Sequence, residues 1–160
     1  MRAVIQRVSQ ATVYRVGERS EGQAAEQSSV VRLGTIGQGI VVLLGVARND
    51  SDETAERMAE RCCRLRIFDD SKGKMNRSLL DIQGSALVVS QFTLLAETRR
   101  GLRPSFDRAA DPSNARRLYD RFISALRAQG VPTQTGEFGA HMNVRLENDG
   151  PVTILLDSES

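Results

Sequence analysis

Residues 39–46 read Gly39-Ile40-Val41-Val42-Leu43-Leu44-Gly45-Val46 and are apolar at consecutive positions. A strand with one face in water would carry a polar residue at every second position, so this run predicts a strand covered on both faces. The stretch Ser85-Ala86-Leu87-Val88-Val89-Ser90 has the same character. Together the two runs predict a sheet that lies between other layers of structure.

Two helices stand out on either side of these strands. Asp50-Ser51-Asp52 offers N-cap residues, and apolar residues then recur at helical spacing from Ala55 to Cys62. The second helix begins at Asp111-Pro112, an N-cap followed by proline, and ends before Gly130. Shorter strands are expected at 4–8, 11–14, 30–33, 65–68, 133–138, 142–146 and 152–156. Because strands greatly outnumber helices, the pattern predicts a mixed α/β fold of layered sheets with helices on one side.

Length and composition narrow the class of protein. The chain has 160 residues, of which 40% are hydrophobic and 26% charged, as expected for one globular domain spanning residues 1–160. Cys62 and Cys63 are adjacent, which disfavours a disulfide framework or a cysteine metal site. The longest apolar run, residues 40–47, is far shorter than the ~18 residues that span a bilayer. No secretory signal is visible, so a cytoplasmic protein without a membrane partner is expected. Residues 17–29 contain no apolar residue larger than alanine and predict a mobile insertion loop.

Basic residues are concentrated in one segment. Residues 97–121 contain seven basic and four acidic residues, whereas the rest of the chain carries 15 basic and 16 acidic residues. Arginine side chains grip phosphates in a bidentate way, so the segment is a candidate phosphate-binding surface. On charge alone, a solvated helix face in an arginine-rich chain is the simpler explanation.

Conventional catalytic motifs are absent. The sequence has no glycine-rich phosphate loop, no Gly-x-Ser-x-Gly elbow and no metal-ligand spacing. The single histidine, His141, is explained more simply as an exposed turn residue than as a general base. Any chemistry must therefore use hydroxyls, backbone dipoles, arginines or the substrate itself.

The stretch Ser90-Gln91-Phe92-Thr93-Leu94 is the first candidate for such chemistry. If the strand continues through it, both faces are apolar up to Val89 and polar beyond. Backbone N–H groups at such a strand end could stabilise an oxyanion. The alternative is that the strand simply ends at the surface.

The stretch Asn148-Asp149-Gly150-Pro151-Val152-Thr153 is the second candidate. Asn-Asp-Gly is a hairpin signal, and the residues alone favour an ordinary turn with a trans Gly-Pro bond, since only about 5–6% of X-Pro bonds are cis.

The two stretches, with flanking pieces in the same order, resemble the D-aminoacyl-tRNA deacylase family (the D-tyrosyl-tRNA deacylases) over nearly the whole chain. The matching flanks are Ile5-Gln6-Arg7-Val8, Val42-Leu43-Leu44-Gly45-Val46, Arg66-Ile67-Phe68, Gly73-Lys74-Met75-Asn76, Gly101-Leu102-Arg103-Pro104-Ser105-Phe106 and Thr135-Gly136-Glu137-Phe138-Gly139-Ala140. The segment at residues 17–29 is longer than the short turn usual there. The resemblance implies a homodimer with a three-layer β/β/α sandwich of two β-sheets and a helical layer. It also implies hydrolysis of the ester that joins a D-amino acid to the 3′-terminal adenosine of tRNA, without a metal or another cofactor.

The resemblance implies roles for particular residues. Gly150-Pro151 is expected to be cis, to reach into the partner's pocket and to reject L-amino acids, with Arg7 bracing it. Further residues are expected around the ester, namely Ser90, Gln91, Phe92 and Thr93. Walls for the terminal adenosine are expected from Phe138, Gly139, Ala140 and Met142. Contacts to tRNA phosphates are expected from Arg99 and Arg100.

An activated ester needs oriented attack and charge stabilisation more than a strong base. Thr93 has no evident base beside it, so we expect water or a tRNA ribose hydroxyl to attack, with the backbone N–H groups of Gln91 and Phe92 facing the oxyanion. Selection by steric exclusion implies that glycyl-tRNA is hydrolysed slowly and L-aminoacyl-tRNA hardly at all. Two other interpretations remain: a serine esterase that uses Ser90 and His141, and a non-catalytic RNA-binding module.

Overall fold

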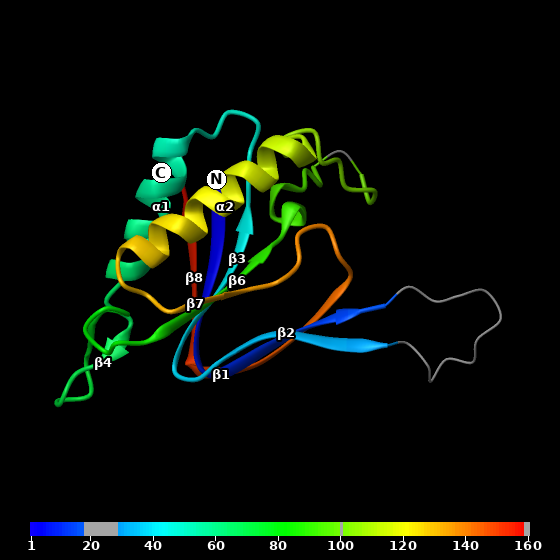
Figure 1. The fold of residues 1–160 in the computed structure, drawn as a ribbon. Helices are drawn as coiled ribbons and strands as arrows, with labels where there is room; N and C mark the ends of the chain where they lie inside the picture. The colour runs from blue at the N-terminus through cyan, green and yellow to red at the C-terminus, as the bar shows by residue number, and fades with distance from the viewer. Residues whose placement is uncertain (18–28, 100, 159–160) are drawn as a thin grey trace.

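The computed structural model describes residues 1–17, 29–99 and 101–158 (Figure 1). The loop predicted at 17–29 therefore lies, apart from its two end residues, outside the described residues. Arg100 also lies outside them.

The central layer is built on β3 (Gly39–Gly45), which is buried along nearly its whole length, as its uninterrupted apolar run predicts. On one side β3 pairs antiparallel with β1 (Arg2–Val16), and on the other it pairs parallel with β6 (Ser85–Ser90). The short β7 (Thr133–Thr135) continues the sheet beside β6.

Two helices cover one face of this layer: α1 (Asp52–Arg64) and α2 (Pro112–Ala128) (Figure 1). The predicted caps are present, because the Ser51 side chain accepts a hydrogen bond from the Thr54 N–H and Asp111 accepts one from the Asn114 N–H. The core between helices and sheet is formed by buried apolar residues, among them Ile5, Ile40, Val42, Leu44, Met58, Cys62, Ala86, Val88, Leu118 and Phe122. Among the described residues, no helix is long and apolar enough to cross a membrane.

A second β layer covers the opposite face of β3 and β6. It consists of β2 (Val30–Ile36), the C-terminal half of β1 and the first half of β8 (Met142–Asp157). A second cluster of buried apolar residues lies between the two β layers and consists of Val8, Ala11, Val13, Ile36, Val41, Leu87 and Val89. The structure thus has the predicted mixed α/β class with three layers.

The two β layers are joined by hydrogen bonds. Residues 2–8 of β1 pair with β3, whereas residues 11–16 pair with β2, so one long strand passes from one layer into the other. Within the described residues, β1, β2, β3, β6, β7 and β8 therefore belong to one bent sheet. The second, separate sheet is the small hairpin of β4 (Phe68–Asp69) and β5 (Met75–Arg77).

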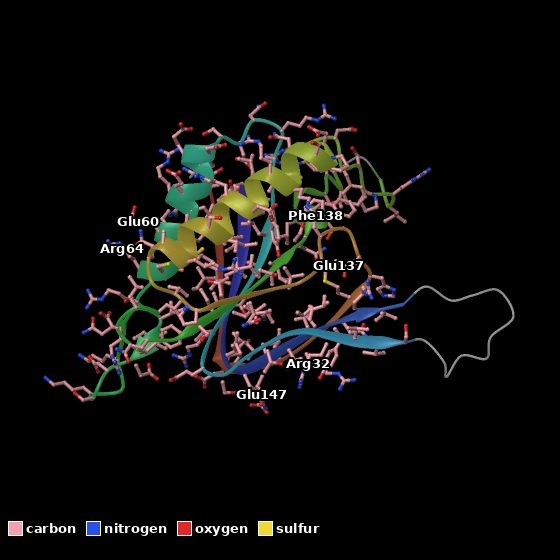
Figure 2. All side chains as sticks on the ribbon, in the orientation of Figure 1. Arg32, Glu60, Arg64, Glu137, Phe138 and Glu147 are labelled. Carbon is pink, nitrogen blue, oxygen red and sulfur yellow. The ribbon has the colours of Figure 1, made fainter. Side chains whose placement is uncertain are left out.

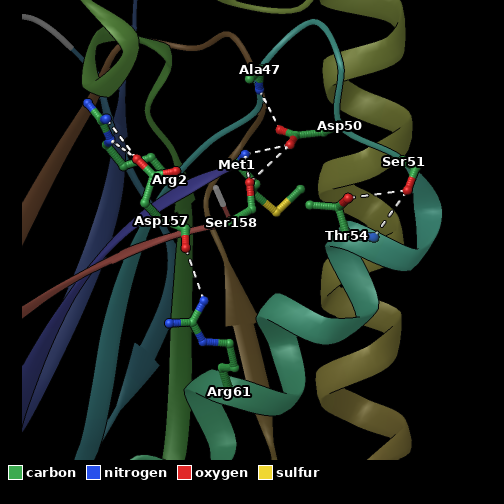
Figure 3. Close-up of polar contacts among 9 residues, drawn as sticks. All are labelled: Met1, Arg2, Ala47, Asp50, Ser51, Thr54, Arg61, Asp157 and Ser158. Carbon is green, nitrogen blue, oxygen red and sulfur yellow. Dashed lines mark hydrogen bonds and ion pairs between the residues drawn. The ribbon is translucent and has the colours of Figure 1, made fainter. Parts of the chain in front are cut away.

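The ends of β1 and β8 are tied to the start of α1 by polar contacts (Figure 3). The Met1 amine donates to Asp50 Oδ1 and to Ser158 Oγ, both at 2.5 Å. Arg2 pairs with Asp157 at 2.7 Å. These contacts fix the helical layer against the edge of the sheet.

Three local predictions are wrong. The strand predicted at 65–68 is formed only from Phe68, and the one at 133–138 stops at Thr135. The strands predicted at 142–146 and 152–156 are one strand, because both halves of β8 pair with β1 and the chain does not reverse at Asn148. Instead Asn148 pairs with Val8 and Thr153 pairs with Gln6, so residues 149–152 bulge out opposite a single β1 residue.

Candidate active site

The end of β6 forms one side of the site. Ser90 pairs with Leu44 of β3, and the next residues turn into a 3₁₀ helix, η1 (Phe92–Leu95). The expected continuation of the strand through Thr93 is therefore wrong. β3 ends at Gly45, so β6 loses its pairing partner at this point.

A pocket of about 490 Å³ opens beside this turn. One wall comes from Ser90, Gln91 and Phe92, and the facing wall comes from residues 138–142, in the loop that leads into β8. Small residues complete the lining, among them Ala109 and Ala110 just before α2 and Ala115 in its first turn. The structure thus brings together the residues predicted around the ester and those predicted around the adenosine. Thr93 is not part of the lining.

The wall at Phe138 is held in place by α2 (Figure 2). The ring of Phe138 lies against that of Tyr119, with centroids 5.9 Å apart and an angle of 54° between the planes. The buried Tyr119 hydroxyl donates to Val88 O at 2.8 Å, and burial raises the pKa of Tyr119, which keeps the phenol protonated as a donor. Sequence analysis missed this support, although Tyr119 is the one polar residue in the buried stripe of α2.

The backbone donors differ from the expectation. The Gln91 N–H donates to Leu44 O at 2.8 Å and cannot serve an oxyanion at the same time. The N–H groups of Phe92 and Thr93 lie in the first turn of η1, where a helix provides no acceptor of its own. Within the described residues, neither N–H has a backbone acceptor. The prediction that the Gln91 N–H faces the oxyanion is therefore wrong, whereas the Phe92 N–H remains a candidate donor.

The candidate nucleophiles lack a hydrogen-bonded base in the described part of the chain. Thr93 Oγ1 accepts a hydrogen bond from the Gln91 side-chain amide, and it has no carboxylate or imidazole partner there. Ser90 and His141 line the same pocket, but no hydrogen bond joins them. The described residues also contain no group of three or more His, Cys, Asp or Glu side chains able to hold a metal ion.

The Gly150-Pro151 bulge is braced by Arg7, which is only 7% exposed. Its guanidinium donates to Ile67 O at 2.7 Å and to Asp149 O at 3.1 Å, and it lies 3.2 Å from the Asp149 carboxylate. The Gly150-Pro151 bond is cis, as the family resemblance implies and against the preference of the residues alone. Both residues of the pair are exposed.

Within one chain this bulge does not reach the pocket. Arg7 pairs with Ile40, which pairs with Ala86, whereas Ser90 lies further along β6. At about 3.3 Å per residue and 4.8 Å between strands, Arg7 and Ser90 are about 16 Å apart. The site predicted from the sequence is thus divided between two ends of the sheet.

The arginines of residues 97–121 lie in different environments. Arg117 and Arg121 pair with Asp52 and Glu56 of α1 and join the two helices. Arg99 is exposed, and its backbone N–H donates to Glu97, which lowers the pKa of that carboxyl. The edge-to-face contact of Phe92 with Phe106, at 5.0 Å, holds the Arg99 loop beside the pocket.

Comparisons with known proteins agree on one family. The sequence profile described as D-Tyr-tRNA(Tyr) deacylase matches residues 4–157. Proteins named D-aminoacyl-tRNA deacylase are similar to this chain: that of Thermomicrobium roseum is 54% identical and that of Roseiflexus sp. 56% identical, each over 99% of this chain and 94% of the relative. The solved structure titled "c-Myc DNA Unwinding Element Binding Protein" is 37% identical, with a TM-score of 0.83 over 98% of both chains. A second structure, titled a probable eukaryotic D-amino acid tRNA deacylase, is 20% identical with a TM-score of 0.74 over 97% of both chains, and supports the fold alone.

Proposed function

The chain belongs to the D-Tyr-tRNA(Tyr) deacylase family, and from this premise we propose that it hydrolyses D-aminoacyl-tRNA to a free D-amino acid and tRNA. The observation that carries the proposal is the pocket, which has an aromatic wall at Phe138 opposite a polar backbone turn at Ser90–Phe92. The aromatic wall suits the terminal adenine, and the turn suits the ester that the adenosine carries. We expect the enzyme to act in the cytoplasm.

The chemistry of this pocket favours charge stabilisation. An attacking water or tRNA ribose hydroxyl turns the ester carbonyl into an oxyanion, and the Phe92 N–H supports this state because it has no backbone acceptor in the described residues. One such preorganised donor is worth about 2.7–4 kcal/mol of transition-state stabilisation. The intermediate formed by water collapses with cleavage of the ester C–O bond, and the tRNA oxygen leaves with the proton that the water gives up, which yields free D-amino acid and tRNA. If a tRNA ribose hydroxyl attacks first, the aminoacyl group moves to that oxygen, and water must then cleave the new ester in the same way.

Replacing the Thr93 or His141 side chain tests this mechanism. Thr93→Ala and His141→Ala should each retain kcat for D-tyrosyl-tRNA within about threefold, because neither side chain has a nucleophile–base hydrogen bond. The measurement is single-turnover deacylation, with Thr93→Ser as the matched variant that keeps a hydroxyl. A hundredfold loss in Thr93→Ala that Thr93→Ser restores would establish threonine as the nucleophile. The same loss in His141→Ala would favour the serine esterase.

Selection of the D form is proposed to come from Gly150-Pro151 of the partner subunit. The bulge is exposed, rigidly braced by Arg7, and distant from the pocket of its own chain, so it suits a pocket in a second copy. Main-chain atoms that hold the substrate amino group would leave no space for an L side chain, whereas a D side chain would point outward. Glycyl-tRNA has no side chain to collide and should be hydrolysed slowly, and specificity among D-amino acids should be broad.

A row of apolar side chains supports the dimer. Leu155, Val4 and Leu43 are in register across three strands and point away from the helices. Leu155 is 61% exposed, which is unusual for a leucine in the middle of a sheet. Leu155 follows Pro151 by four residues on β8, so a second copy that covers this row would lie beside the exposed bulge.

Leu155→Arg should therefore produce a monomer that is still folded. Its deacylation rate should fall by about a hundredfold, because each pocket loses the partner's bulge and with it the substrate orientation. Light scattering gives the mass and circular dichroism the fold. Val31→Arg is the matched control, since Val31 is an exposed apolar residue on β2, and it should leave mass and rate unchanged. A fully active Leu155→Arg monomer would contradict the shared site.

The proposed function is tested by deacylation of matched D-tyrosyl-, L-tyrosyl- and glycyl-tRNA. The expected order is fast for D-tyrosyl, slow for glycyl and negligible for L-tyrosyl. Equal rates on the two tyrosyl enantiomers would point to an unselective esterase, and binding without hydrolysis would point to an RNA-binding module. Arg99 is proposed to contact tRNA phosphates beside the pocket, and Arg100 is proposed from the sequence alone.

A further inference from the structure

Lysine is confined to one place in this chain. Of the 22 basic residues only Lys72 and Lys74 are lysines, and both lie in the turn of the β4–β5 hairpin. The hairpin is outside the pocket and outside the bulge described above.

The turn has a defined conformation. The Asp70 carboxylate accepts the backbone N–H groups of Lys72 at 2.8 Å and Lys74 at 3.1 Å, and it also accepts the Asn76 amide. These hydrogen bonds hold the pKa of Asp70 below its usual value, so the carboxylate stays ionised. Gly73 has a φ of +70°, which a turn of this kind requires. The Asp70 carboxylate thus stabilises the backbone of the turn.

The two ammonium groups remain available. Both lysines are exposed, and within the described ranges neither ammonium has a hydrogen bond or an ion pair. The hairpin's arginines differ, because Arg66 donates to Asn76 and Arg77 donates to Asp81 O at 2.7 Å. The turn therefore presents two ammonium groups that are engaged in no ion pair with a described residue, on a backbone that the Asp70 hydrogen bonds hold in place.

Arg7 connects this hairpin to the Gly150-Pro151 bulge. Its guanidinium holds Ile67 O and lies 3.6 Å from the Asp69 carboxylate at the base of the hairpin, while it also holds Asp149. Lys72 lies three residues after Asp69, a backbone reach of at most about 11 Å. Arg7 therefore links the base of the charged turn to the bulge.

We propose that Lys72 and Lys74 bind backbone phosphates of the tRNA whose 3′ end occupies the pocket that this chain's bulge serves. The proposal rests on the proposed function. Lysine suits the task because a compact ammonium on a flexible stem contacts successive phosphates without fixed geometry. Each phosphate neutralised releases counterions, so the contact must depend on salt.

The double variant Lys72→Glu/Lys74→Glu tests this contact. KM for D-tyrosyl-tRNA should rise roughly tenfold, and the slope of log(kcat/KM) against log[salt] should become shallower by about 1.5. For the D-tyrosyl ester of adenosine, which has no phosphates, kcat/KM should not change. Arg32→Glu/Arg57→Glu is the charge-matched control on exposed positions of β2 and α1, and it should keep the wild-type slope.

The possible outcomes distinguish a failure of the proposed function from a failure of the lysine–phosphate contact. Wild-type protein that leaves D-tyrosyl-tRNA intact refutes the proposed function. Active wild-type protein with an unchanged KM and slope in the lysine variant overturns only the phosphate contact. An equal loss on the adenosine ester also overturns it, because the hairpin would then act by positioning the bulge. An equal slope change in the Arg32/Arg57 control would assign the effect to overall charge.

Discussion

Gly150→Ala should lower kcat/KM for D-tyrosyl-tRNA by about a hundredfold, since even small displacements of substrate-orienting groups cost that much. Gly150 has a φ of +121°, a conformation that residues with a side chain rarely adopt. An added Cβ would lie 2.9 Å from Val152 Cγ2, 3.0 Å from Arg7 Nη2 and 3.2 Å from the Val152 nitrogen. Arg7 is fixed by its own hydrogen bonds and cannot retreat, so the bulge itself must shift.

The matched control is Gly130→Ala, after α2. Gly130 has a φ of +85°, and nothing lies within 4 Å of the Cβ position. Both variants should lose about 1–2 kcal/mol of unfolding free energy from backbone strain, but only Gly150→Ala should lose activity. Kinetics on D-tyrosyl-tRNA together with urea unfolding separate the two effects. If kcat/KM of Gly150→Ala stays within threefold of the wild-type value, the bulge does not orient the substrate.

Arg7→Met should produce the second large loss, again about a hundredfold in kcat/KM, because the bulge then loses its brace. Methionine keeps much of the apolar volume but leaves Ile67 O and Asp149 O without their donor. The unfolding free energy should fall by about 2–3 kcal/mol, since the guanidinium is buried although its carboxylate partners are half-exposed.

Arg64→Met controls for the loss of an ion-paired arginine. Arg64 is 64% exposed and pairs with Glu60 one turn away on α1 (Figure 2). Its replacement should cost at most about 0.5 kcal/mol and leave the kinetics unchanged. If Arg7→Met is destabilised but fully active, Arg7 supports the fold alone.

The parts of the fold that local patterns determine are predictable from the sequence. The capped, periodic segments became α1 and α2, and the uninterrupted apolar runs became the buried strands β3 and β6. The errors arise where pairing between strands that are distant in the sequence determines the structure. Asn148-Asp149-Gly150 carries a local hairpin signal, yet both flanking halves find the same partner, β1, so the chain bulges instead of reversing.

In the candidate site, too, local patterns were predictive and contacts between distant segments were not. The sequence indicates which residues could react, but the Gln91 N–H is occupied by Leu44 O, a contact set by the register of β6 on β3. Charge counting also could not separate Arg117 and Arg121, which join the helices, from Arg99 beside the pocket. The support of Phe138 by Tyr119 could not be predicted either, because it depends on where α2 lies relative to the loop that leads into β8.

The central claim is that the bulge of one subunit completes the pocket of the other. Two variants with strongly reduced activity test it most directly: Gly150→Ala, with a damaged bulge, and Ala140→Trp, whose side chain fills the pocket lined by Ala140. When the two are co-expressed with different affinity tags and the mixed dimer is isolated, one of its two composite sites is intact in both parts. D-tyrosyl-tRNA deacylation should then return to about half of the wild-type rate per dimer, because a two-fold symmetric dimer has two such sites. Mixed dimers no more active than either variant alone would show that bulge and pocket do not work across subunits.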